Sequence, residues 1–213
     1  MNIIIMGAPG AGKGTQSEII SERYEIPSVS TGAILRAEIA AGTELGKKAQ
    51  AVVESGGLVS DELMSNMIKS RLGEPDCAGG YILDGFPRTI NQAKVLDEMG
   101  VNIDCVLYMD VSDEVIIDRL SGRRMCGKCG AGYHIRYSPS KAGETLCEQC
   151  GGELVIRKDD KTETIKNRLA TFHEQTVPVV KYYEDKGLLC KVEGHGTVEQ
   201  ITEKTLRALE ELQ

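Results

Sequence analysis

The chain has 213 residues, enough for one domain with insertions or for two small domains, and it is 41% hydrophobic and 27% charged, as globular proteins usually are. A formal net charge of −7 argues against a general binder of nucleic acids or anionic membranes, so a phosphate site must gather its cations locally. The apolar runs are too short for a transmembrane helix and the N-terminus lacks a signal-peptide pattern, so we expect a cytoplasmic protein.

Up to residue 121, apolar strand patterns alternate with helical patterns. The expected strands are Asn2 to Met6, Pro27 to Ser30, Tyr81 to Asp84 and Cys105 to Val111. The expected helices are Lys13 to Tyr24, Thr31 to Ala41, Glu44 to Ser55, Asp61 to Leu72, one ending at Met99 and one after Ser112, with Ser30, Ser60 and Ser112 as N-caps. Because the strands are apolar throughout, they predict a parallel sheet covered by helices on both faces.

From Gly122 to about Ile156, residues typical of turns replace the helical pattern, which predicts an inserted module of short strands. The helical pattern returns from Thr162 to Asp185, where Pro178 predicts a kink or break. A last strand is expected at Leu188 to Glu193 and a last helix at Val198 to Leu212.

The segment GAPGAGK, Gly7 to Lys13, has the spacing of a phosphate-binding loop between a strand and a helix. Backbone N–H groups in such a loop line a concavity, and the helix N-terminus adds positive partial charge. Lys13 would reach the β- and γ-phosphates of a nucleotide. Gly14 stands where Ser or Thr usually binds Mg²⁺, and Thr15 comes one residue later, which puts direct coordination of the metal by a hydroxyl in question. A glycine-rich turn without a ligand is the alternative.

Four of the seven cysteines form two Cys-x-x-Cys pairs, Cys126 with Cys129 and Cys147 with Cys150. This spacing is typical of a tetrahedral zinc site, and four protein ligands would make the metal structural because no position stays open. A metal would stabilise a module too small to build much of a core. Two disulfides, or Fe²⁺ or Co²⁺ in place of Zn²⁺, are the alternatives.

Four motifs together resemble the adenylate kinase family in its long form with a large lid: GAPGAGKGT, LDGFPRT, GRR, and RKDD followed by NRL. The resemblance runs from Met1 to about Gly196. It implies an α/β P-loop NTPase fold with a parallel five-stranded sheet, and Mg-dependent phosphoryl transfer from ATP to AMP that gives two ADP. It also implies one kinase domain with core segments 1–29, 60–121 and 160–213, a helical AMP-binding insert at 30–59, and a small β-rich lid at 122–159.

The resemblance implies site residues, each matched to a position of this sequence. The implied catalytic residues are Lys13, Asp84, Arg88, Arg123, Arg157 and Arg168, with Asp84 holding Mg²⁺ through water. The implied ATP-binding residues are Gly10, Ala11, Gly12, Lys13, Gly14, Thr15, Arg119, Arg123 and His134. The implied AMP-binding residues are Thr31, Arg36, Leu58, Val59, Gly85, Arg88, Gln92, Arg157 and Arg168. Asp159 and Asp160 match lid carboxylates near the arginines, and for His134 a packing role in the lid is an open alternative.

Phosphoryl transfer is also consistent with the chemistry of these residue types. Transfer depends mainly on positioning and electrostatics, and an acceptor phosphate, with a second pKa of about 6, needs no general base. Arginine suits the task because its planar fork binds phosphate oxygens in pairs. Water must leave before transfer, so we expect the lid to close over ATP.

Two other functions fit parts of the sequence. A zinc ribbon that binds nucleic acid beside an ATPase loop would explain the cysteines, but the chain is acidic and the ribbon offers only Tyr133 and Tyr137 as aromatics. A kinase that phosphorylates UMP, CMP or GMP is the stronger alternative, although the resemblance implies that Thr31 and Gln92 favour adenine. We therefore expect ATP, AMP and ADP as ligands, no nucleic-acid or membrane partner, and a monomer.

Overall fold

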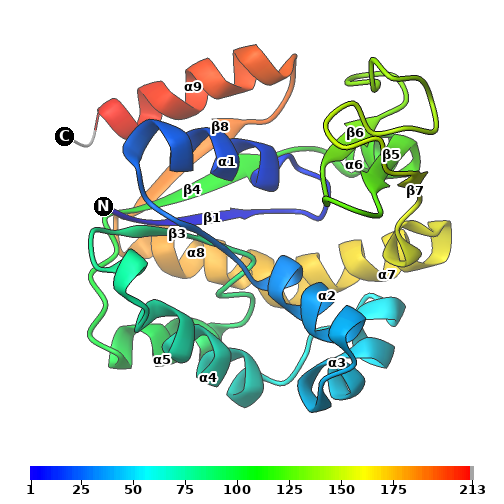
Figure 1. The fold of residues 1–213 in the computed structure, drawn as a ribbon. Helices are drawn as coiled ribbons and strands as arrows, with labels where there is room; N and C mark the ends of the chain where they lie inside the picture. The colour runs from blue at the N-terminus through cyan, green and yellow to red at the C-terminus, as the bar shows by residue number, and fades with distance from the viewer. Residues whose placement is uncertain (212–213) are drawn as a thin grey trace.

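The computed structural model describes residues 1–211, and a five-stranded sheet with the order β2-β3-β1-β4-β8 forms its centre (Figure 1). The strands are β1 (Asn2–Gly7), β2 (Ser28–Ser30), β3 (Tyr81–Asp84), β4 (Cys105–Asp110) and β8 (Leu189–Glu193). Every neighbouring pair runs parallel. The predicted parallel sheet is confirmed.

The sheet is buried on both faces because its strands are apolar. Side chains alternate between the faces along a strand, so Ile3 and Ile5 enter one apolar cluster while Ile4 and Met6 enter another. Helix α1 packs on the first face, and helices α4, α5 and α8 pack on the second (Figure 1). Two apolar layers therefore hold the strands, and the carboxyl ends of the strands share one edge.

The helices agree with the predicted segments to within one or two residues at the ends that can be compared. They are α1 (Lys13–Tyr24), α2 (Thr31–Ala41), α3 (Glu44–Ser55), α4 (Asp61–Leu72), α5 (Ile90–Glu98), α6 (Asp113–Gly122), α7 (Thr162–Thr171), α8 (Val177–Asp185) and α9 (Val198–Glu210). The expected end of the last helix at Leu212 lies outside the described residues. Among residues 1–211, no helix combines the length and the hydropathy needed to cross a bilayer.

Two of the three expected N-caps do not form as predicted. The side chains of Ser60 and Ser112 make no capping hydrogen bond. Acidic residues in the first turns of α4 and α6 instead lie at the positive ends of these helices.

The predicted break near Pro178 is confirmed, because a π-helical turn at Phe172–Thr176 separates α7 from α8. Two 3₁₀ turns, Pro75–Cys77 and Lys158–Asp160, had no counterpart in the sequence analysis.

Residues 122–159, which we call the lid, carry a small antiparallel sheet with the order β6-β5-β7. Its strands are β5 (Arg123–Cys126), β6 (Gly132–His134) and β7 (Leu154–Val155). The short strands and turns expected in this segment are confirmed. The lid and the α2–α3 pair both lie beyond the carboxyl ends of the central strands (Figure 1).

Candidate active site

The loop between β1 and α1 is shaped by its glycines. Gly10 and Gly12 have φ angles of 85° and 99°, and a Cβ on Gly10 would lie 2.7 Å from a carbon of Leu120. Only glycine combines this positive φ with the absence of a Cβ that would collide with Leu120. The first turn of α1, which contains Gly14 and Thr15, has no acidic residue and no side-chain cap. Its N–H groups can therefore bind an anion.

Lys13 lies where this loop enters α1, and its Nζ donates to the carbonyl oxygens of Gly7 and Ala8, both at 2.9 Å. The pKa of Lys13 is lowered to about 8, mainly by burial; the charge of Asp84 opposes this shift, and the charges of nearby arginines add to it. A bound anion would reverse this effect, because it would stabilise the charged amine. Ala11, beside Lys13 in the loop, is fully buried.

Asp84 is the last residue of β3, and Gly85 follows it. Gly85 holds the side chains of two residues expected to bind AMP, Thr31 and Arg88. The Gly85 carbonyl oxygen accepts hydrogen bonds from Thr31 Oγ1 at 3.0 Å and from Arg88 Nε at 2.8 Å. Gly85 has a φ of 84°, and a Cβ there would lie 2.7 Å from Thr31 Oγ1. The carboxylate of Asp84 accepts from Ser30 Oγ at 3.3 Å. These contacts bring the ends of β2 and β3 together beside the phosphate loop.

Three expected phosphate-binding arginines are held by carboxylates at the end of the lid. Arg123 Nε donates to Asp160 at 2.7 Å, and Arg168 Nη1 donates to the same carboxylate at 3.1 Å. Arg157 Nε donates to Asp159 at 2.8 Å. The pKa of Arg168 is lowered to about 10, mainly by burial; the charge of Asp159 opposes this shift, and the charges of Arg123 and Arg157 add to it. The arginines thus disfavour one another's charge, and anions at this place would relieve that repulsion.

The remaining AMP-side residues lie on the α2–α3 side and in α5. Arg36 in α2 has its pKa lowered to about 10 by burial first and by the charge of Arg157 second. Leu58 and Val59 follow α3 and are half-buried, and Val59 packs against the second apolar cluster. Gln92 is buried in the first turn of α5 with an exposure of 2%. Its amide contacts Asp61, a residue the sequence analysis had assigned only to a helix start.

The two expected ATP-side residues outside the loop differ in their surroundings. Arg119 donates to the Ala11 carbonyl oxygen at 3.3 Å and to that of Gly194 at 2.7 Å, which places it against the phosphate loop. The His134 Nδ1 accepts from the backbone N–H groups of Arg136 and Tyr137, and its ring stacks on Tyr137 with centroids 4.4 Å apart. These are packing contacts within the lid, and a role of His134 toward ATP stays a prediction.

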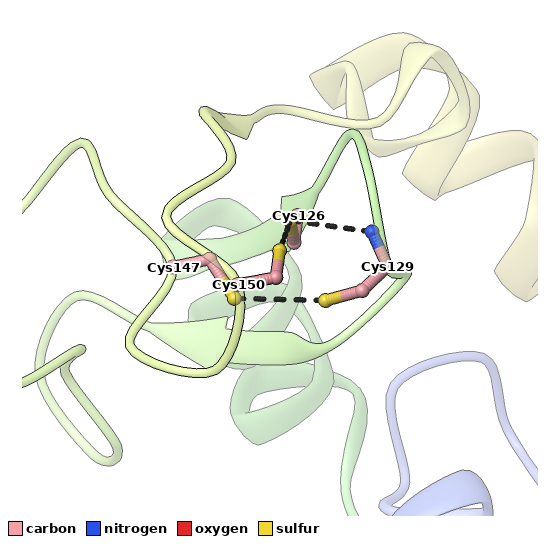
Figure 2. Close-up of side chains that lie close together, drawn as sticks. All are labelled: Cys126, Cys129, Cys147 and Cys150. Atoms are coloured by element: carbon pink, nitrogen blue, oxygen red, sulfur yellow. Dashed lines mark hydrogen bonds between the residues drawn. The ribbon is translucent and has the colours of Figure 1, made fainter.

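The four lid cysteines converge, with all their sulfur atoms within 4.8 Å of one another (Figure 2). The Sγ atoms of Cys126 and Cys150 are 3.5 Å apart, and those of Cys129 and Cys147 are 3.6 Å apart. A disulfide would require about 2.05 Å, so these pairs are not bonded. A tetrahedron with metal–sulfur bonds of about 2.3 Å separates its sulfurs by about 3.8 Å, which is close to the spacing found.

The backbone around the cysteines favours thiolates. Cys126 Sγ accepts from the backbone N–H groups of Lys128 and Cys129, each at 3.4 Å. These hydrogen bonds lower the pKa of Cys126. Tyr133 Oη lies 3.2 Å from Cys147 Sγ and can donate to it. A thiolate set with donors behind it fits a divalent metal such as Zn²⁺.

Comparison with known proteins shows which protein family this chain resembles over most of its length. Residues 5–188 match the family model described as adenylate kinase. A protein of Acetivibrio thermocellus named adenylate kinase is 51% identical over 213 residues, covering 98% of both chains. Adenylate kinases of Caldicellulosiruptor bescii and Methanothrix thermoacetophila are 50% and 48% identical, covering 98% and 100% of this chain and 99% and 100% of their own.

Proposed function

The chain belongs to the adenylate kinase family, and from that premise we propose that the residues around the Gly7–Lys13 loop transfer a phosphoryl group from ATP to AMP. The family identifies the protein as a phosphotransferase that interconverts ATP and AMP with ADP and uses its nucleotide with Mg²⁺. The roles of individual residues are the proposal, and they rest on the geometry described above.

One observation supports the assignment above all others: arginines from separate elements gather near Lys13, and two of them, Arg123 and Arg168, bind the same carboxylate of Asp160. The charges of Arg88, Arg123 and Arg168 all act on Lys13. These arginines come from the segment after β3, from the lid and from α7. A loop that bound one triphosphate would not need cations from so many directions. Two nucleotides placed phosphate to phosphate would need them.

We assign a donor side and an acceptor side to this cation cluster. The donor side holds ATP through Gly10, Ala11, Gly12, Lys13, Gly14, Thr15 and Arg119. The acceptor side holds AMP through Thr31, Arg36, Leu58, Val59, Gly85, Arg88 and Gln92. We assign Arg123, Arg157 and Arg168 to the region between the two sides, where they would stabilise the phosphoryl group in transit.

The chemistry then requires positioning and charge, not a base. An oxygen of the AMP phosphate forms a bond to the γ-phosphorus of ATP while the bond from that phosphorus to the bridging oxygen breaks, which leaves two ADP. Arg123, Arg157 and Arg168 offset the charge that spreads over the moving group. To do so they must redirect donors that now bind Asp159 and Asp160. Mg²⁺, when bound, neutralises phosphate charge, and Asp84 is the carboxylate beside the loop that would hold it.

We propose that the lid and residues 30–59 move toward the core when both nucleotides bind. Closure would bring Arg123 against the phosphates and exclude water, which protects ATP from hydrolysis. Spin labels on the lid and the core would measure their separation with and without a bisubstrate analogue. Closure predicts a shorter distance with the analogue, and equal distances would refute it.

We propose that the lid holds one structural Zn²⁺ on its four cysteines. The sulfur spacing and the donors to Cys126 support it. Elemental analysis of the purified protein should find about one zinc per chain, and Cys147→Ser should lower that content. Fe²⁺ or Co²⁺ in the purified protein would keep the site and change the metal. Absence of any metal would refute the proposal.

The acceptor test separates this function from its closest alternative. Wild-type protein with Mg-ATP is offered AMP, UMP, CMP and GMP in turn, and ADP production is measured for each. The proposal predicts that AMP is by far the best acceptor. A preference for UMP, CMP or GMP would assign the protein to another nucleotide kinase function. We further propose a cytoplasmic monomer without nucleic-acid or membrane partners, which light scattering and a DNA-binding titration would check.

A further inference from the structure

Both ends of the Gln92 side-chain amide are bound by neighbouring groups. Its Oε1 accepts from the backbone N–H of Arg88 at 2.8 Å, and its Nε2 donates to Asp61 Oδ1 at 2.8 Å. A backbone N–H can only donate and a carboxylate can only accept. The two partners therefore determine which end of the amide is oxygen and which is nitrogen.

Asp61 is itself held in place by the start of α5. Its carboxylate accepts from Thr89 Oγ1, with both oxygens at 3.0 Å, and from Asn91 Nδ2 at 3.1 Å. Thr89 Oγ1 in turn caps α5 by accepting from the Gln92 backbone N–H at 3.1 Å. Asp61 is the first residue of α4, so its carboxylate joins the N-termini of two packed helices. It is a fixed acceptor opposite the Gln92 amide nitrogen.

The orientation of this amide matters for the choice of base. The amide keeps one N–H and one oxygen lone pair after its contacts with Asp61 and Arg88. Adenine offers an acceptor at N1 and a donor at its 6-amino group. Hypoxanthine, the base of IMP, offers the reverse: a donor at N1 and an acceptor at O6. An amide that fits one base must be turned over to fit the other.

We propose that Asp61 is a specificity-determining positioning residue that holds the Gln92 amide in the orientation complementary to adenine. The inference rests on the proposed function, which places Gln92 at the base of AMP. Turning the amide would set its nitrogen against the Arg88 N–H and its oxygen against the Asp61 carboxylate. Both contacts would be repulsive, so a 6-oxopurine monophosphate is rejected by the protein's own hydrogen bonds.

The test compares AMP with IMP as acceptors, since the two share their size and differ at positions 1 and 6 of the base. Asp61→Asn replaces an obligatory acceptor with a side chain that can donate or accept, so it tolerates either orientation of Gln92. The Arg88 N–H still restrains the amide. We expect the ratio of kcat/KM for AMP to that for IMP to fall about tenfold, since one of two mismatches is removed. KM for ATP should stay unchanged.

Asn91→Ala is the matched control. It removes one hydrogen bond to the same carboxylate, but Asn91 has no contact with the Gln92 amide among the hydrogen bonds of residues 1–211. It should keep the wild-type AMP-to-IMP ratio. Should Asp61→Asn fail to fold, Asp61→Ser asks the same question, because a hydroxyl also donates and accepts.

The outcomes separate this inference from the function on which it rests. An unchanged ratio in folded Asp61→Asn, or an equal fall in Asn91→Ala, would overturn the role of Asp61. Wild-type protein that phosphorylates IMP as well as AMP would also overturn it. Wild-type protein that phosphorylates neither would instead overturn the proposed function.

Discussion

The central sheet and the lid differ in what lies at their centres. In the sheet, Ile3, Ile82 and Leu107 are completely buried within large apolar clusters. In the lid, the buried members of the apolar cluster are Cys126, Tyr133 and Cys147, and two of these are proposed metal ligands. The sheet therefore depends on the hydrophobic effect, whereas the lid, with so small an apolar cluster, would depend on the proposed thiolate–metal bonds. If so, the lid can open or lose its structure while the core stays folded.

The two regions also hold their cations differently. Lys13 is supported by a rigid loop in which Gly10 packs directly against Leu120. The lid residues Arg123 and Arg157 are paired with carboxylates that phosphates can replace. On the proposed assignment, the core presents the phosphate loop, and the lid supplies arginines whose carboxylate partners would be exchanged for phosphates.

The largest expected effect concerns the phosphate loop of the core. Lys13→Met should lower kcat by about 10²- to 10³-fold, because it removes a charge that stabilises the transferring group. The metal content of the lid should not change. Lys128→Met is the control, since Lys128 is an exposed lysine of the lid, and its activity should stay within about twofold of wild type. Steady-state kinetics and elemental analysis measure both, and equal losses in the two variants would contradict the assignment.

A cavity in the sheet should weaken the core without affecting the lid. Leu107→Ala should reduce the free energy of unfolding by about 2–5 kcal/mol, measured by urea denaturation. Ile135→Ala, at a lid position that is 56% exposed, should change it by less than about 0.5 kcal/mol. If Leu107→Ala also lowered the affinity of the lid for metal, the two regions would not be independent.

The uptake of protons on ATP binding near pH 8 should report on Lys13 of the core, because the arginines of the lid stay charged at that pH. Burial lowers the pKa of Lys13 to about 8, and bound phosphates should raise it again. Binding of ATP at pH 8 should therefore take up about half a proton, and affinity should fall as the pH rises above 8. Calorimetry in buffers of different ionisation enthalpy measures the uptake. No linkage between pH 7 and 9 would show that Lys13 is fully charged before ATP binds, and net proton release would show that another group dominates the linkage; either result would contradict this prediction.

The smallest expected effect is confined to the lid. Tyr133→Phe removes the hydroxyl that lies 3.2 Å from Cys147 Sγ, and it should lower the free energy of local lid opening by about 1 kcal/mol. Global unfolding should be unaffected. Tyr137→Phe is the control, since the Tyr137 hydroxyl donates to Asp118 and not to a cysteine. Amide exchange in the lid measures the effect of each variant with and without metal. Only the effect of Tyr133→Phe should depend on the metal, and unchanged exchange in Tyr133→Phe would exclude a contribution of the Tyr133–Cys147 contact.

Much of the fold could be predicted because its signals are local. The helix Glu44–Ser55 begins after Thr43, which caps it, and ends at Gly56, which takes the left-handed conformation that glycine favours. Pro178 predicted an interruption of the helix, but not that it would be a π-helical turn or that it would occupy Phe172–Thr176, because these residues continue an ordinary helical pattern. That turn depends on tertiary contacts, among them the hydrogen bond from Thr176 Oγ1 to the Arg88 carbonyl oxygen at 3.0 Å.

The same distinction applies to the site. The phosphate loop and each Cys-x-x-Cys pair are short local motifs that the sequence shows directly, and the convergence of the four cysteines that their spacing predicted is confirmed. The contact between Asp61 and Gln92 spans 31 positions and exists only because α4 packs against α5. Asp61 therefore looked like an ordinary acidic residue at a helix start. Only the three-dimensional structure shows that its carboxylate also accepts a hydrogen bond from the Gln92 side chain.

Amide hydrogen exchange before and after metal chelation tests most directly whether the core and the lid are held by different forces. We predict that chelation removes protection from residues 123–155 while β1 and β4 keep theirs, and that Zn²⁺ restores the lid. A lid that stays protected without metal, or a central sheet that loses protection together with the lid, would contradict the account.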